Sequence, residues 1–187
     1  MKITGENVIA APPEAVWRAL NDPEVLRRAI PGCETLEKVT DSSFKATVTT
    51  RIGPIQAKFN GQVELTDLDP PNGYTIRGQG SGGVAGSAKG GARVRLAPAP
   101  EGTRLTYDAD AQVTGKLAQL GSRLIDSTAK MLAGQFFDRF QEIVTAEAAG
   151  QLPAAAASKP VREGLPEWVW IAAFAGLVLL VLIFGWR

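Results

Sequence analysis

The 187-residue chain contains no histidine and a single cysteine, Cys33. Without histidine there is no Ser-His pair, no imidazole metal ligand and no side chain whose ordinary pKa lies near neutral pH. One cysteine forms neither an internal disulfide nor a multi-cysteine zinc or iron–sulfur site. We therefore expect no metal site, and we interpret Cys33 as a small buried apolar side chain.

Net charge is also almost absent, because 20 Lys and Arg residues oppose 19 Asp and Glu residues. Proteins that bind nucleic acid usually concentrate basic residues on one surface, so we expect no nucleic-acid partner. The acidic residues follow no recognisable catalytic spacing. Asp108 and Asp110 fall on one face of a predicted strand, where a solvated surface or the flank of a rim would suit them. We predict that the protein is not an enzyme and carries no covalently bound cofactor.

The first residues, MKITGENVIAAPPEAVW, contain no uninterrupted apolar run. A secretory signal peptide is therefore not expected, and we predict that the N-terminal domain lies in the cytoplasm. Residues 148–166 are rich in Ala and Pro, and Pro153, Pro160 and Pro166 oppose one continuous helix. We interpret this segment as a flexible tether.

The segment WVWIAAFAGLVLLVLIFGW, residues 168–186, is long, apolar and uncharged. A helix of this length spans ~28 Å, close to the ~30 Å thickness of the hydrocarbon core of a bilayer. Trp168, Trp170 and Trp186 would lie at its two ends, where tryptophan favours the membrane interface. We predict a single-pass anchor over residues 167–187 in the cytoplasmic membrane.

The remaining chain, residues 1–147, has the pattern of an α+β domain. Residues 2–10 alternate as a strand, Pro12 and Pro13 suit the first turn of a helix, and Asn21 or Asp22 can cap a second short helix. About six further strands, separated by turn residues, follow up to residue 113 and indicate an antiparallel meander. Residues 116–148 form one long amphipathic pattern with apolar residues at three-to-four spacing.

The stretch RGQGSGGVAGSAKGGARVRL, residues 77–96, contains the spacing G-x-G-x-x-G at Gly78, Gly80 and Gly83. A dinucleotide-binding loop needs a helix directly after these glycines, whereas here the following residues alternate as a strand. We therefore predict no nucleotide site. Sheet curvature is the preferred interpretation of the glycines, and a mobile rim that admits a ligand is the alternative.

The order of these elements resembles the helix-grip fold of the START-like (SRPBCC) superfamily. That resemblance implies a curved antiparallel sheet of about seven strands around the long C-terminal helix, with an apolar cavity between them. Four motifs narrow the resemblance to one family, because they are similar to the CoxG family of carbon monoxide dehydrogenase subunits. They are NDPEVL at residues 21–26, IPGCE at residues 30–34, which is the most specific, the glycine-rich stretch, and GQFFDRF at residues 134–140.

This resemblance implies a tethered protein that recruits a carbon monoxide dehydrogenase-type molybdenum hydroxylase to the membrane. It also implies a lipophilic quinone, ubiquinone or menaquinone, held in the cavity for delivery to that enzyme. A pure anchor without ligand, a general lipid-binding or transfer protein and a helix-grip enzyme stay open as alternatives. The candidate cavity residues are Trp17, Leu20, Leu26, Ile30, Phe59, Leu120, Leu124, Met131 and Phe136, and the candidate rim residues are Pro31, Gly32, Gly82, Gly83 and Gly86.

Overall fold

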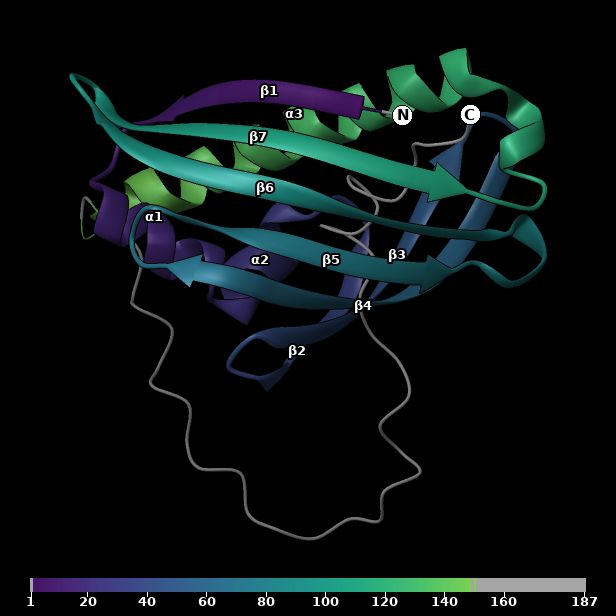
Figure 1. The fold of residues 1–187 in the computed structure, drawn as a ribbon, viewed down its shortest axis with the longest axis horizontal. Helices are drawn as coiled ribbons and strands as arrows, with labels where there is room; N and C mark the ends of the chain where they lie inside the picture. The colour runs from purple at the N-terminus through teal and green to yellow at the C-terminus, as the bar shows by residue number, and fades with distance from the viewer. Residues whose placement is uncertain (1, 149, 151–187) are drawn as a thin grey trace, which may run out of the picture.

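The structure is a computed structural model that describes residues 2–148 and 150. It contains seven strands and three α-helices (Figure 1). In chain order these are β1 (Lys2–Ile9), α1 (Pro13–Leu20), α2 (Pro23–Ala29), β2 (Cys33–Thr40), β3 (Ser43–Ile52), β4 (Ile55–Asp69), β5 (Gly73–Ser81), β6 (Ser87–Ala99), β7 (Gly102–Val113) and α3 (Ser122–Ala148), with short 3₁₀ turns at Gly83–Ala85 and Ala118–Leu120.

All seven strands form one antiparallel sheet in the order β1-β7-β6-β5-β4-β3-β2. Strands β2 to β7 follow one another as hairpins, and β1 pairs along β7 to form the edge of the sheet opposite β2. The helices α1, α2 and α3 lie on the same face of the sheet, which we call the inner face (Figure 1). This arrangement is the helix-grip fold, so the predicted α+β architecture and meander are confirmed.

The two short helices begin where the sequence predicts. Pro13 occupies the first turn of α1, where its missing N–H costs nothing. The Asp22 carboxylate caps α2 by accepting hydrogen bonds from the backbone N–H groups of Glu24, at 2.8 Å, and Val25, at 3.4 Å. The buried hydroxyl of Thr103 on β7 donates to the carbonyl of Ala11 at 2.6 Å and so fixes the segment that leads from β1 into α1.

The long helix begins later than its periodicity predicts. Residues 116–121 form a turn and a 3₁₀ segment, and α3 starts at Ser122. Gly121 has φ +83°, a conformation that stops a continuous helix at this point. The inward stripe of α3 therefore includes Ile125, Leu132 and Phe136. Leu124 and Met131 are 37% and 50% exposed, so the prediction that they line the cavity is wrong.

The glycine-rich stretch forms strand β5, one 3₁₀ turn and strand β6, with no helix after the glycines. Gly86 has φ +121°, and a Cβ there would collide with the Thr114 carbonyl oxygen. The turn between β5 and β6 is thus packed closely against the segment that follows β7. Its geometry needs glycine for steric reasons.

No helix within the described residues is long and apolar enough to cross a membrane. The predicted anchor at 167–187, with Trp168, Trp170 and Trp186, lies outside the described residues, as does the predicted tether from residue 151 onward.

Replacing Gly86 by Ala is expected to lower the free energy of unfolding by about 1–3 kcal/mol, because the new Cβ meets backbone in a region of φ that only glycine adopts easily. Gly134→Ala on α3 is the matched control. A Cβ at Gly134 meets nothing within 4 Å, so this change should stabilise the helix by about 0.5–1 kcal/mol. Denaturant unfolding of the variants measures both changes. Equal stability of the Gly86→Ala variant and the wild type would contradict this account.

Candidate functional site

The inner face of the sheet and α3 enclose an apolar cavity of about 50 Å³. Two of the predicted cavity residues, Leu20 of α1 and Phe136 of α3, lie in its wall. The sheet contributes alternate residues of β1, β5, β6 and β7, whose side chains point to this face. The complete lining is Ile3, Leu20, Tyr74, Ile76, Ala92, Val94, Leu105, Tyr107, Ala109, Ala133, Phe136 and Phe137.

Aromatic rings form one side of the cavity. Tyr107 of β7 stacks on Phe137 of α3 with ring centroids 5.5 Å apart, and Phe137 meets Phe136 edge-on at 5.1 Å. Half-buried Trp17 of α1 contacts another residue of the wall, Tyr74 of β5, edge-on at 5.4 Å. Such offset and edge-on contacts are the favourable arrangements of aromatic pairs. Aromatic residues of α1, α3, β5 and β7 thus pack in or against the wall of the cavity.

Two tyrosines, Tyr74 and Tyr107, belong to this apolar wall. Burial raises the pKa of Tyr74 and of Tyr107 above the ordinary value, because desolvation disfavours the phenolate. Both side chains therefore keep their O–H protons at neutral pH and can donate a hydrogen bond. Tyr107 has room for its ring because Gly5 of β1 lies beneath it, and a Cβ at Gly5 would collide with that ring.

The other predicted cavity residues lie elsewhere. Leu26 and Ile30 are buried in the core around α2, and Phe59 of β4 is buried beside Gly82. Leu120 is half-buried in the 3₁₀ segment before α3. The structure therefore brings only Leu20 and Phe136 of the predicted set to the cavity, with Trp17 in contact with its wall.

The predicted rim residues form two separate turns. Pro31 and Gly32 connect α2 to β2, and the Gly32 carbonyl accepts a hydrogen bond from the Thr49 N–H at 2.9 Å. Gly82, Gly83 and Gly86 belong to the turn between β5 and β6. Neither turn contributes a residue to the lining of the cavity.

Tyr74, Tyr107 and Phe137 are site residues that the sequence analysis missed. Strand alternation was the available signal, since Tyr74 and Ile76 share one face of β5 and Leu105, Tyr107 and Ala109 share one face of β7. The prediction relied on the helical apolar stripe, and most of the lining comes from the sheet.

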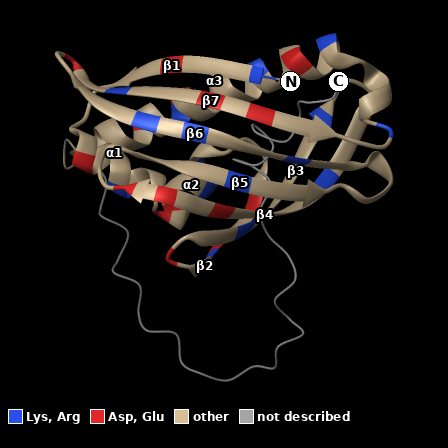
Figure 2. Ribbon diagram, in the orientation of Figure 1, with Lys and Arg blue, Asp and Glu red and all other residues tan. Residues whose placement is uncertain are grey.

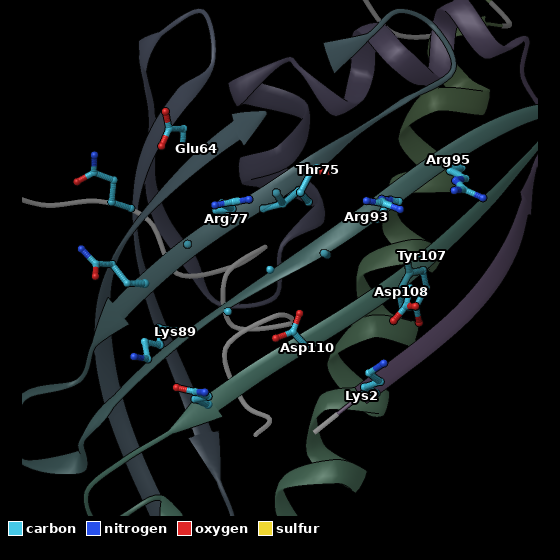
Figure 3. A pocket seen from close by; sticks show the side chains of 18 of the residues that line it. Lys2, Glu64, Thr75, Arg77, Lys89, Arg93, Arg95, Tyr107, Asp108 and Asp110 are labelled. Carbon is cyan, nitrogen blue, oxygen red and sulfur yellow. The ribbon is translucent and has the colours of Figure 1, made fainter. Parts of the chain in front are cut away.

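The opposite, outer face of the sheet carries a second concavity. It is an open groove of about 1000 Å³ over β4, β5, β6, β7 and β1, and its labelled side chains are shown in Figure 3. Five basic residues line it, Lys2, Arg77, Lys89, Arg93 and Arg95, together with three acidic ones, Glu64, Asp108 and Asp110. Asp108 and Asp110, which the sequence placed on one strand face, thus lie in the wall of this groove.

Within the described residues, no three acidic or cysteine side chains gather in a way that could hold a metal ion. Cys33 begins β2, and its thiol donates to the Thr35 carbonyl at 3.4 Å. Burial raises the pKa of Cys33 to about 11, although the positive charge of Arg27 lowers it. Beside it, hydrogen bonds from Lys58 and Thr49 lower the pKa of the exposed Glu34 carboxyl.

Solved structures with a similar fold agree with the helix-grip architecture described above. A conserved protein from Geobacillus kaustophilus matches with a TM-score of 0.74 and 31% identity, covering 79% of this chain and 97% of its own. A protein from Thermus thermophilus matches with a TM-score of 0.60 and 20% identity, covering 79% and 99%. A protein from Rhizobium leguminosarum matches with a TM-score of 0.60 and 16% identity, and the match covers 78% of this chain and 94% of its own. The last two similarities concern the fold alone.

The chain is therefore a helix-grip protein with an apolar cavity under its long helix. The model of the CoxG family, described as a subunit of carbon monoxide dehydrogenase, matches residues 5–145, and the chain belongs to this family. The resemblance seen in the sequence motifs is thereby confirmed. Among curated proteins, no match was found.

Alkylation of Cys33 by iodoacetamide should be slow at neutral pH, because the raised pKa keeps the thiol protonated and only the thiolate reacts. The rate is expected to rise about tenfold per pH unit through pH ~9, where an ordinary thiol with a pKa of ~8.5 levels off. Free cysteine in the same buffers is the control, and circular dichroism checks that the fold persists. A plateau below pH ~9 would contradict the desolvation of this thiol, which is half-buried rather than fully buried as the sequence predicts.

Proposed function

We propose that the protein is a non-enzymatic, membrane-tethered accessory protein of a carbon monoxide dehydrogenase-type molybdenum hydroxylase. In this proposal it recruits that enzyme to the cytoplasmic membrane and holds a lipophilic quinone for delivery to it. The observation that carries the proposal is the family match over residues 5–145, which associates the chain with carbon monoxide dehydrogenase.

The apolar segment at residues 168–186 supports the recruitment part. A membrane segment joined to the domain by a flexible linker keeps a bound enzyme at a high local concentration near the bilayer. Lipophilic electron acceptors are dissolved in that bilayer. Recruitment therefore shortens the path between the enzyme and its acceptor without any catalytic group in the recruiting protein.

The cavity supports the quinone part. Its wall is apolar, which suits the apolar body of a lipophilic quinone. Aromatic side chains such as Phe136 and Phe137 offer flat surfaces for the ring.

The volume of the cavity sets a condition on this binding. About 50 Å³ is well below the ~300–1,000 Å³ of typical ligand sites, so a quinone enters only when the wall moves outward. Of the elements outside the hydrogen-bonded sheet, α3 supplies most of the wall, namely Ala133, Phe136 and Phe137. We infer that α3 shifts away from the sheet during uptake.

Filling the cavity tests the quinone part. Ala133 of α3 is buried in the wall, and Ala133→Phe adds a ring that occupies the space. Met131→Phe is the matched control, since residue 131 on the same helix is 50% exposed. We expect the full chain, purified in mild detergent, to carry close to one quinone per chain, and the Ala133→Phe variant to lose at least about 80% of it, which from near saturation corresponds to about 2 kcal/mol or more of lost binding free energy.

Solvent extraction and mass spectrometry of the three proteins measure the bound lipid, and thermal unfolding verifies that the Ala133→Phe variant is folded. Equal quinone in both variants would contradict binding in this cavity. Phospholipid in place of quinone would favour a general lipid-binding protein, and an empty wild-type chain would favour a pure anchor.

Deleting residues 151–187 tests the recruitment part. The full chain is expected to hold the molybdenum hydroxylase in the membrane fraction of cells that produce both, whereas the shortened chain should leave the enzyme in the soluble fraction. The domain itself is intact in the shortened chain, because all described strands and helices precede residue 151. Immunoblots of the two fractions make the comparison. Equal amounts of membrane-bound enzyme in both strains would contradict the proposed tether.

A further inference from the structure

The outer face of the sheet is organised in rows that cross the strands. In one row, Glu64, Arg77, Gly91, Asp110 and Lys2 lie side by side on β4, β5, β6, β7 and β1. Gly91 has no side chain, so the middle of this row forms the floor of the groove. The long side chains around it form the walls (Figure 3).

The rows on either side of Gly91 place further cations along β6. Lys89, Arg93 and Arg95 alternate with inward residues of this strand and so point to the outer face. Figure 2 shows this face with basic residues on β5 and β6 and acidic residues on β4 and β7. Arg93 is paired in register with Asp108, whereas Lys89 lies between Gln79 and Gln112.

Positive charge is therefore in excess in the groove. Each of its three carboxylates has a cation directly across the strand pair: Arg77 for Glu64, Arg93 for Asp108 and Lys2 for Asp110. Lys89 and Arg95 have no carboxylate opposite them. In the described part of the chain, the ion pairs involve other residues, and none of the eight charged groups in the groove forms one.

We propose that this groove is the docking surface for an acidic, convex part of the molybdenum hydroxylase. Carboxylates of the partner would contact Arg77, Lys89, Arg93 and Arg95, and its ridge would lie over Gly91. The identity of the partner in this inference rests on the proposed function. The groove itself is defined by the register of the strands and by the charges that line it.

The observations favour a protein over other anionic partners. A membrane surface is flat and uniformly anionic, so it would not fill a groove of about 1000 Å³ and would repel Glu64, Asp108 and Asp110. Nucleic acid is disfavoured by the same three carboxylates. If a second copy of the protein bound through the same face, two concave grooves would face each other and neither would be filled. An acidic protein ridge satisfies both the shape and the excess of positive charge.

The groove also lies on the opposite side of the sheet from the cavity. Arg93 and Asp108 point outward, while their chain neighbours Ala92, Val94 and Ala109 line the cavity. Docking on the outer face therefore leaves α3 uncovered and able to shift.

The test is a double charge reversal, Lys89→Glu with Arg95→Glu, in the full chain, because these two cations have no carboxylate opposite them. The matched control is Arg51→Glu with Arg123→Glu, which changes the net charge equally at two exposed positions outside the groove. Biolayer interferometry with the purified hydroxylase, at low and high salt, measures affinity. We expect the groove variant to bind at least tenfold more weakly at low salt and to lose most of the salt dependence, while the control stays within about threefold of wild type.

Four outcomes would overturn the inference. The groove variant could bind the hydroxylase as tightly as the control does, which would leave the proposed recruitment intact and refute only this surface. The groove reversal could instead weaken binding to phosphatidylglycerol vesicles alone, or dissociate a dimer in sedimentation analysis, which would assign the groove to lipid or to a second copy. A wild-type chain that does not bind the hydroxylase at all would refute the proposed function and this inference together.

Discussion

The alternation of side chains along β5, β6 and β7 is the constraint on which the rest of the structure depends. Inward residues such as Ile76, Ala92 and Leu105 form the surface on which α3 packs, and outward residues such as Arg77, Arg93 and Asp108 form the charged groove. A slip of one residue in any of these strands would exchange the two sets, placing charge under α3 and apolar side chains in water. The hairpin turns that hold the register therefore support both surfaces at once.

Packing of α3 against this inner face closes the domain. Phe136 and Phe140 are almost fully buried and stack with ring centroids 5.6 Å apart, and they anchor the helix over the sheet. The cavity is left where the aromatic side chains do not fill the space completely. Because its wall is apolar, its chemistry matches a ligand with a large apolar body.

Much of the fold could be predicted from local patterns. The strand at Ile55–Asp69 alternates from Ile55 to Leu65, and Asp22 followed by Pro23 marks the start of α2, so local patterns indicate both elements. The start of α3 could not be obtained in this way, because the apolar spacing continues through Gly121 and only the backbone there interrupts the helix. That error also assigned Leu124 and Met131 to the wrong face. The charged groove needed the cross-strand register, which depends on turn geometry rather than on composition.

Binding of a quinone next to Trp17 is the central claim, and fluorescence tests it most directly. Replacing Trp168, Trp170 and Trp186 by Phe leaves Trp17 as the sole tryptophan, in contact with Tyr74 of the cavity wall. Titration with a short-tailed ubiquinone should then quench the emission in a saturable manner that ends near one equivalent per chain. Quenching that rises linearly with quinone concentration, as it does for free tryptophan, would contradict the account.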